Sequence, residues 1–192
     1  MRTVVLVSWI FLVTVAARGA NFAQENEQHG DIEVGVVLDT AEQTGRASAT
    51  VRIHAGREVV WSLITSCTEA LRMVPGLVDC EVLDTASDRS WQRIRQVMDY
   101  SWFVRRLSYE IIATYDKPGQ ASMERVSGDL TTLKVTWNLK SDGDYTIAQY
   151  KVDLNPGFWV PRWLVRGALK RDLPKMLRAL RTRAESVANQ PR

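Results

Sequence analysis

Histidine and cysteine, which most often hold metal ions or carry nucleophilic chemistry, are scarce: the chain has two of each in 192 residues. No spacing of His, Cys, Asp and Glu matches a metal-binding motif. A Ser–His–acid triad would have to use His54, and no G-x-S-x-G elbow accompanies it. The sequence therefore predicts no metal site, no cofactor and no hydrolase triad.

Long apolar runs are also lacking, apart from TVVLVSWIFLVTVAA near the N-terminus, which is about 15 residues long. A bilayer-spanning helix needs roughly 20 apolar residues. A positive start, a short apolar run and small residues after it predict a signal peptide over residues 1–20, hence export to the periplasm or secretion. An uncleaved N-terminal anchor is the alternative. We expect the polar residues 21–30 to form a linker.

The excess of positive charge is small, at +3, and uneven. Between Arg162 and Arg183 one acid, Asp172, accompanies eight basic residues: Arg162, Arg166, Lys170, Arg171, Lys175, Arg178, Arg181 and Arg183. The rest of the chain is slightly acidic. A nucleic-acid binder is expected to be basic over a wider surface, so no nucleic-acid partner is predicted.

Hydrophobic periodicity divides the remaining sequence into strands and helices. Two strands are expected at 32–38 and 45–55, then a helix from about Gly56 that breaks near Ser66 and a second short helix ending at Met73. Six strand-like runs follow, separated by turn sequences at hairpin spacing. The last segment, about Val160 to Val187, has an apolar stripe at helical spacing. Pro174 lies inside it and predicts a kink.

Alternation in the strand FVRRLSYEIIATYD separates two faces. The more apolar set, Leu107, Tyr109, Ile111 and Ala113, is expected to face inward. Glu110 then faces outward, opposite Arg93 or Arg95 on a neighbouring strand. An inward Glu110 acting as a general base is the alternative.

Four strings in order resemble the START-like, or SRPBCC, superfamily, and most closely its polyketide cyclase/dehydrase and coenzyme Q-binding branch. They are IHAGREVVWSLIT, LRMVPGLVDCEVLD, RVSGDLTTLKVTWNLK and YKVDLNPGFWVPRWLVRGALKRDLPKMLRAL. The resemblance implies an α+β helix-grip fold over residues 31–188. In this fold a curved antiparallel sheet wraps around a long C-terminal helix, and two short helices lie near the N-terminal end.

That fold implies a cavity for an apolar small molecule such as a lipid, quinone or polyketide. We expect Tyr109 and Leu169 in its wall, and Trp102, Trp159 and Trp163 at its mouth, since aromatic rings give a large apolar surface with a polar tip. Trp61 and Trp137 are expected in the core. Two other functions remain open: a cyclase- or dehydratase-like enzyme using the same cavity, and a protein-interaction domain with a collapsed interior.

The last helix fits two roles. As a lid, it buries its apolar stripe on the concave face of the sheet and leaves its basic face in water; as a membrane-surface helix, it lies on lipid. We favour the lid, with contact between the basic face and an anionic membrane as a secondary role. A monomer is expected.

The family-like path also brings Cys67, between the two short helices, near Cys80, early in the next strand. In an exported protein the two can form a disulfide. Two buried thiols that never meet are the alternative.

Overall fold

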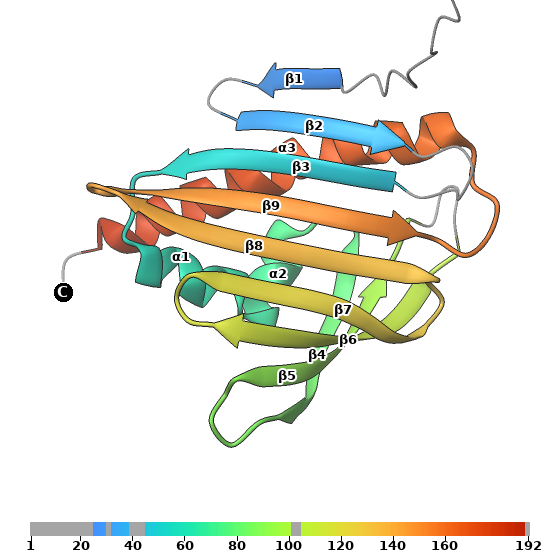
Figure 1. Cartoon of the computed structure of the whole chain (residues 1–192), viewed down its shortest axis with the longest axis horizontal. Helices are drawn as coiled ribbons and strands as arrows, with labels where there is room; N and C mark the ends of the chain where they lie inside the picture. Colours follow the sequence, from blue (N-terminus) through green and yellow to red (C-terminus); the bar gives the residue numbers. More distant parts are fainter. Residues whose placement is uncertain (1–24, 30–31, 39–44, 101–104, 191–192) are drawn as a thin grey trace, which may run out of the picture.

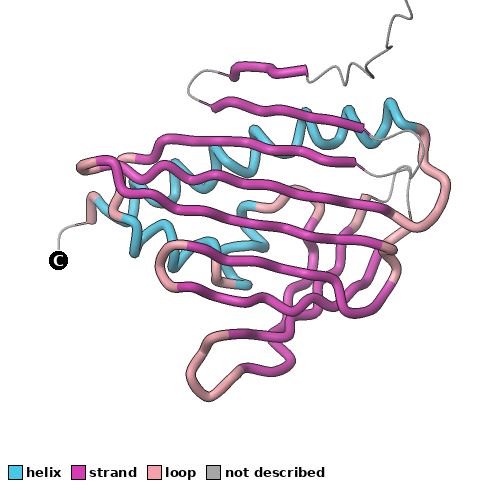
Figure 2. Tube along the Cα trace, viewed as in Figure 1, coloured by secondary structure: helices cyan, strands magenta, loops and turns pink. Residues whose placement is uncertain are grey.

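The computed structural model of the chain describes residues 25–29, 32–38, 45–100 and 105–190. In this part of the chain a single antiparallel sheet curves around the long helix α3 (Arg162–Ala188) (Figure 1). Two short helices, α1 (Arg57–Ile64) and α2 (Cys67–Met73), pack against α3. The tube view shows the same arrangement, with both short helices on the concave side of the sheet (Figure 2). The helix-grip fold predicted from the sequence is confirmed.

The described strands are joined in the order β1-β2-β3-β9-β8-β7-β6-β5-β4. Their bounds are β1 Glu25–His29, β2 Ile32–Leu38, β3 Gly45–Ile53, β4 Leu77–Thr85, β5 Trp91–Met98, β6 Leu107–Asp116, β7 Gln120–Gly128, β8 Thr132–Asp142 and β9 Tyr145–Asn155. Strands β4 to β9 form a meander of hairpins. The last strand, β9, pairs with β3, so the two ends of the domain meet in the middle of the sheet.

Strand β1 lies in the segment 21–30 that was expected to be a linker, and it pairs with β2 along its length. The sequence ENEQH shows no apolar alternation, which explains why a strand was not predicted. Pairing at a sheet edge requires only backbone groups, so such a strand needs no buried face of its own. The expected signal peptide, residues 1–20, lies outside the described residues.

The inner face of the sheet follows the predicted alternation. Ala47, Ala49, Val51 and Ile53 of β3 are buried, and so are Leu107, Tyr109, Ile111 and Ala113 of β6. Glu110 lies on the opposite face of β6 and pairs in register with Arg95. Its outward position removes the reason to consider it a catalytic base.

Helix α3 buries one stripe and exposes the other. Leu173, Met176, Leu177, Leu180 and Ala184 are buried, and the helix contacts β2, β3, α1 and α2. The helix continues through Pro174, which is itself buried. The apolar stripe is therefore covered by the domain's own core.

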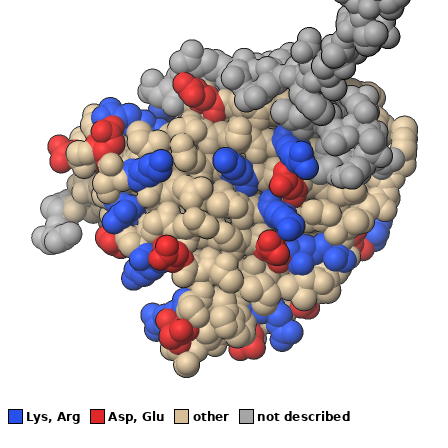
Figure 3. All heavy atoms as spheres, viewed as in Figure 1, with Lys and Arg blue, Asp and Glu red and all other residues tan. Residues whose placement is uncertain are grey.

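Charged side chains on the outer face of the sheet are interspersed by sign rather than gathered (Figure 3). Cross-strand ion pairs such as Arg46–Asp153 and Lys134–Glu124 lie on this face. No helix among the described residues is both long enough and apolar enough to cross a membrane.

Candidate ligand cavity

A cavity of about 290 Å³ lies between the concave face of the sheet and α3. Ligand pockets span roughly 300–1,000 Å³, so this one is at the small end of the range. Most of the sheet's inward-facing lining residues come in pairs from four strands: Ile94 and Met98 of β5, Tyr109 and Ile111 of β6, Val135 and Trp137 of β8, and Tyr150 and Val152 of β9; β4 and β7 add Cys80 and Met123. Strand alternation places both members of each pair inside, because an even number of positions separates them along their strand.

Helix α3 forms the opposite wall with residues at helical spacing. The wall runs through Val165, Leu169, Leu173, Met176 and Leu180. Because these residues follow a period of three to four, they all lie on the stripe that faces the sheet. The cavity is thus enclosed by the same helix face that holds the core together.

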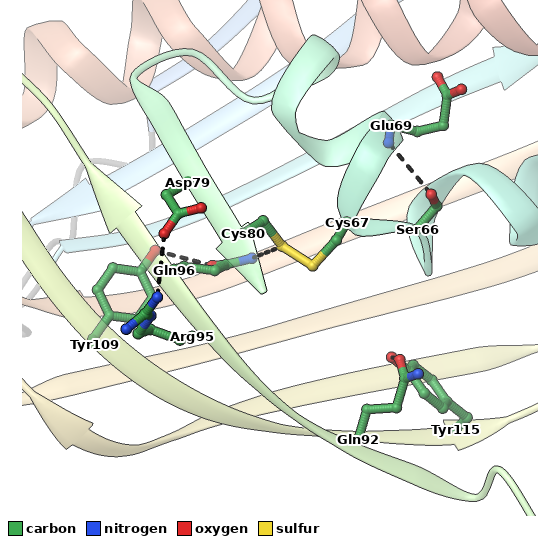
Figure 4. Close-up of a disulfide and its surroundings, with 10 residues drawn as sticks. All are labelled: Ser66, Cys67, Glu69, Asp79, Cys80, Gln92, Arg95, Gln96, Tyr109 and Tyr115. Atoms are coloured by element: carbon green, nitrogen blue, oxygen red, sulfur yellow. Dashed lines mark hydrogen bonds and ion pairs between the residues drawn. A yellow bond between two sulfur atoms is a disulfide. The ribbon is translucent and has the colours of Figure 1, made fainter. Parts of the chain in front are cut away.

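A disulfide closes one end of the cavity. Cys67, the first residue of α2, is bonded to Cys80 of β4, with 5.4 Å between their Cα atoms, and both residues line the cavity (Figure 4). Gln96 of β5 accepts a hydrogen bond from the Tyr109 hydroxyl (3.1 Å), and its side-chain amide donates to the Cys80 sulfur (3.9 Å). The disulfide and its polar neighbours join α2 to the sheet.

Helix α2 is also tied to α3. Ser66 caps α2 by accepting a hydrogen bond from the Glu69 backbone N–H (Figure 4). The Glu69 carboxylate accepts two hydrogen bonds from the Arg183 guanidinium, at 3.0 and 3.1 Å. These hydrogen bonds are the main cause of the lowered pKa of Glu69. The ion pair holds α2 over the end of the cavity.

Four tyrosines contribute hydroxyl groups to the cavity wall: Tyr100, Tyr109, Tyr115 and Tyr150. Burial raises the pKa of Tyr115 to about 12. Burial, and then the charge of Asp172, raises the pKa of Tyr100 to about 12. Burial also raises the pKa of Tyr109 and of Tyr150 well above the usual value. All four hydroxyls therefore keep their protons at neutral pH, and those of Tyr109 and Tyr115 donate them to Gln96 and Gln92.

Asp172 is the acidic residue of the lining. Its two carboxylate oxygens accept hydrogen bonds from the neighbouring Arg171, at 2.7 and 3.1 Å. The Tyr100 hydroxyl has two acceptors within reach, the Pro75 carbonyl oxygen at 3.3 Å and the Asp172 carboxylate. The hydrogen bonds from Arg171 compensate the negative charge that Asp172 places beside an apolar cavity.

The structure brings only some of the predicted site residues together. Tyr109 and Leu169 line the cavity. Trp159 and Trp163 flank lining residues but are themselves 75% and 72% exposed and do not line it. Trp102 lies outside the described residues. Trp61 and Trp137 are buried as expected, and Trp137 also lines the cavity.

The sequence analysis did not identify Tyr100, Tyr150 or Asp172 as site residues. Tyr150 had a usable signal, because it shares the inward face of its strand with Val152 and Leu154. The sequence signal for Asp172 was weaker. It is the only acid between Arg162 and Arg183, a basic stretch of the helix, and it lies one position before the buried Leu173. Within the described ranges, no group of three or more His, Cys, Asp or Glu side chains is arranged to hold a metal ion.

Comparisons with known proteins agree with this geometry. The chain is similar in structure to a STAR-related lipid transfer protein from Xanthomonas axonopodis, with a TM-score of 0.71, 19% identity, and coverage of 83% of this chain and 97% of that one. A START superfamily protein from Mycobacterium smegmatis gives a TM-score of 0.64 at 20% identity, covering 74% of this chain and 98% of that one. The Zhui aromatase/cyclase from Streptomyces sp. R1128 gives a TM-score of 0.62 at 15% identity, covering 74% of this chain and 94% of that one.

At these identities the structural likeness shows the fold alone. No curated protein matches the sequence. Residues 53–181, about two thirds of the chain, match the sequence profile of a family described as polyketide cyclase / dehydrase and lipid transport. The chain belongs to this family.

Proposed function

We propose that this protein is an exported binding protein that holds an apolar small molecule, such as a lipid, quinone or polyketide, in the cavity between its sheet and α3. The observation that carries the proposal is the cavity itself: about 290 Å³, enclosed mainly by aliphatic and aromatic side chains. Burying apolar ligand surface contributes about 25 cal/mol per Å². A collapsed interior, expected of a purely protein-binding domain, would offer no such surface.

Native mass spectrometry of protein purified from its own host tests this proposal. We expect a single class of apolar molecule to co-purify in a 1:1 ratio. Ala168→Trp, which fills the cavity from α3, is expected to abolish the adduct, whereas Thr182→Trp on the exposed face of the same helix is expected to retain it. An adduct that persists equally in both variants would contradict binding in this cavity.

An enzyme is the second candidate, and Asp172 is the observation that favours it. A cyclase or dehydratase needs an acid or base at its cavity, and this carboxylate lines it beside the Tyr100 hydroxyl. Binding ranks first because both oxygens of Asp172 are already engaged by Arg171. If the enzyme proposal holds, the molecule recovered from Asp172→Asn protein differs in covalent structure from the one recovered from the unaltered protein.

Export is supported by the N-terminal pattern and by the Cys67–Cys80 disulfide, since disulfides persist mainly in oxidising compartments. N-terminal sequencing of host-produced protein is expected to begin between about Arg18 and Gln24. An intact Met1 on protein recovered from the cytoplasm would overturn this part of the proposal.

Peripheral contact with an anionic membrane would let ligand pass between bilayer and cavity. It is supported by the exposed Trp159 and Trp163 at the start of α3 and by the exposed basic residues Arg171, Lys175 and Arg178 along it. Exposed tryptophans suit the membrane interface, and each nearby basic residue contributes about 1 kcal/mol at an anionic surface.

Vesicle sedimentation tests this contact. Binding to vesicles containing phosphatidylglycerol is expected to exceed binding to pure phosphatidylcholine vesicles and to fall with added salt. The double change Trp159→Ser and Trp163→Ser is expected to weaken it, whereas Trp91→Ser, at the start of β5, is not. Equal binding to both vesicle types would contradict the contact.

A further inference from the structure

The cavity wall has a charge pattern that restricts its ligand. Among the described lining residues there is no Lys, Arg or His, and the one acid, Asp172, is already paired with Arg171. An anionic headgroup inside the cavity would lose its hydration and find no lining cation to replace it, which makes its transfer from water unfavourable. It would also lie near the Asp172 carboxylate. The wall therefore favours an uncharged molecule.

One tyrosine hydroxyl in this wall has no partner within the described part of the chain. Tyr109 donates to Gln96, Tyr115 donates to Gln92 at 2.9 Å, and Tyr100 has acceptors in Pro75 and Asp172. The Tyr150 hydroxyl, in contrast, makes no hydrogen bond to any described residue, although it lines the cavity. Tyr150 is partly buried and lines the cavity. Its hydroxyl can therefore take a hydrogen-bond partner from a molecule bound in the cavity.

The position of the Tyr150 ring is fixed by its neighbours. It packs against Trp137, its cross-strand partner, with 4.7 Å between ring centroids. Tyr150 and Tyr100 both lie near enough to Tyr109 to affect its ionisation electrostatically, so the three hydroxyl groups belong to one region of the wall. The hydroxyl is thus held in place by a packed ring before any ligand binds, which reduces the entropy lost on binding.

We infer that Tyr150, with Tyr100 and Tyr109 beside it, forms a polar subsite for the oxygen atom of an uncharged apolar ligand, an alcohol or a ketone, with the Tyr150 hydroxyl donating the hydrogen bond. The inference rests on the proposed function and narrows its ligand class. It separates neutral alcohols and ketones, which the subsite accepts, from hydrocarbons, which leave it unsatisfied, and from carboxylates, which the wall rejects.

Isothermal titration calorimetry with four ligands of equal chain length tests the subsite: decane, 1-decanol, 2-decanone and decanoate at about pH 8. In the delipidated full-length protein, 1-decanol and 2-decanone are expected to bind about tenfold more tightly than decane, as for one buried hydrogen bond. Decanoate is expected to bind more weakly than 1-decanol. The Tyr150→Phe change is expected to remove the tenfold preference and to leave decane affinity within about twofold.

Tyr145→Phe is the matched control, because it makes the same change on the same strand, and Tyr145 stacks on His54 outside the cavity. It is expected to keep the preference. Three outcomes would overturn the subsite while leaving apolar binding intact. They are an unchanged preference for 1-decanol and 2-decanone in Tyr150→Phe, an equal loss of affinity for all four ligands in that variant, and tighter binding of decanoate than of 1-decanol. Absence of binding for all four ligands would overturn the proposed function and the subsite with it.

Discussion

At the scale of single residues, the tyrosines of the cavity make stability sensitive to high pH. Burial raises the pKa of Tyr100 and of Tyr115 to about 12, and that of Tyr109 and Tyr150 is raised as well. Unfolded tyrosines ionise near pH 10. Between these values the unfolded chain releases protons that the folded chain retains, so the free energy of unfolding falls as pH rises.

We therefore expect the stability contributed by these hydroxyls to be fully present below about pH 10 and to fall as pH rises above it, with the share of Tyr100 and Tyr115 lost between about pH 10 and 12. Tyrosinate absorbance at about 295 nm checks this expectation. Native protein is expected to show less ionisation at about pH 11 than protein in about 8 M urea at the same pH. A native titration that matches the urea titration would contradict burial of the four side chains.

Gly128 is a second residue on which the cavity wall depends. It has a positive φ of 102°, and a Cβ built there would collide with the Ser108 carbonyl oxygen and the Tyr109 Cα. Gly128→Ala therefore strains its own backbone and pushes on β6, at a cost of at least about 2 kcal/mol. Chemical denaturation measures this cost. Gly56→Ala is the control, since nothing lies within 4 Å of a Cβ there, and equal stability of the two variants would contradict the close contact.

At the scale of elements, the disulfide holds α2 against β4. Its closed loop has a sequence separation of 13, for which loss of the cross-link is expected to cost about 3 kcal/mol. The double change Cys67→Ser and Cys80→Ser is expected to lower the free energy of unfolding by about this amount, as does reduction of the unaltered protein. Two free thiols per chain in denatured, unreduced exported protein would show that the bridge does not form.

Periodicity predicted most elements because their burial is regular. The alternation in β3 and β6 and the stripe of α3 each identify the buried face, and Ser66 marks the break between α1 and α2. Strand β1 escaped prediction because an edge strand can form from backbone pairing alone. The site was harder to predict. Trp159 and Trp163 were chosen by residue type, and residue type does not show whether a ring near the start of a helix lines a cavity or lies in solvent.

The polar part of the cavity depends on contacts between distant segments. Tyr109 on β6 meets Gln96, its partner on the adjacent strand β5, and Asp172 of α3 meets Tyr100, which follows β5. Neither pair has a fixed spacing in sequence, because register and helix position decide which side chains converge. The sequence thus predicted a cavity and its apolar wall, and the structure was needed to find the hydroxyls in it.

At the scale of the whole molecule, α3 joins the parts of the domain into one core. It contacts β2 and β3 of the sheet and both short helices, and its Leu177 is fully buried. A change at this position should therefore affect the entire domain rather than one helix. A helix that served only as a membrane anchor would behave differently, because its loss would leave the sheet folded.

Leu177→Asp separates these two cases. Burying an unpaired carboxylate costs several kcal/mol, so we expect a large fall in melting temperature and a single cooperative transition followed equally by tryptophan fluorescence and by circular dichroism. Arg178→Asp introduces the same carboxylate one position later on the exposed face, where it is expected to change the melting temperature little. Arg178→Asp also replaces a positive charge by a negative one, so it is expected to weaken binding to anionic vesicles while the domain stays folded. Leu177→Asp is expected to weaken vesicle binding only because it unfolds the domain. Lost vesicle binding with an unchanged melting temperature in Leu177→Asp would show that α3 serves the membrane and not the core.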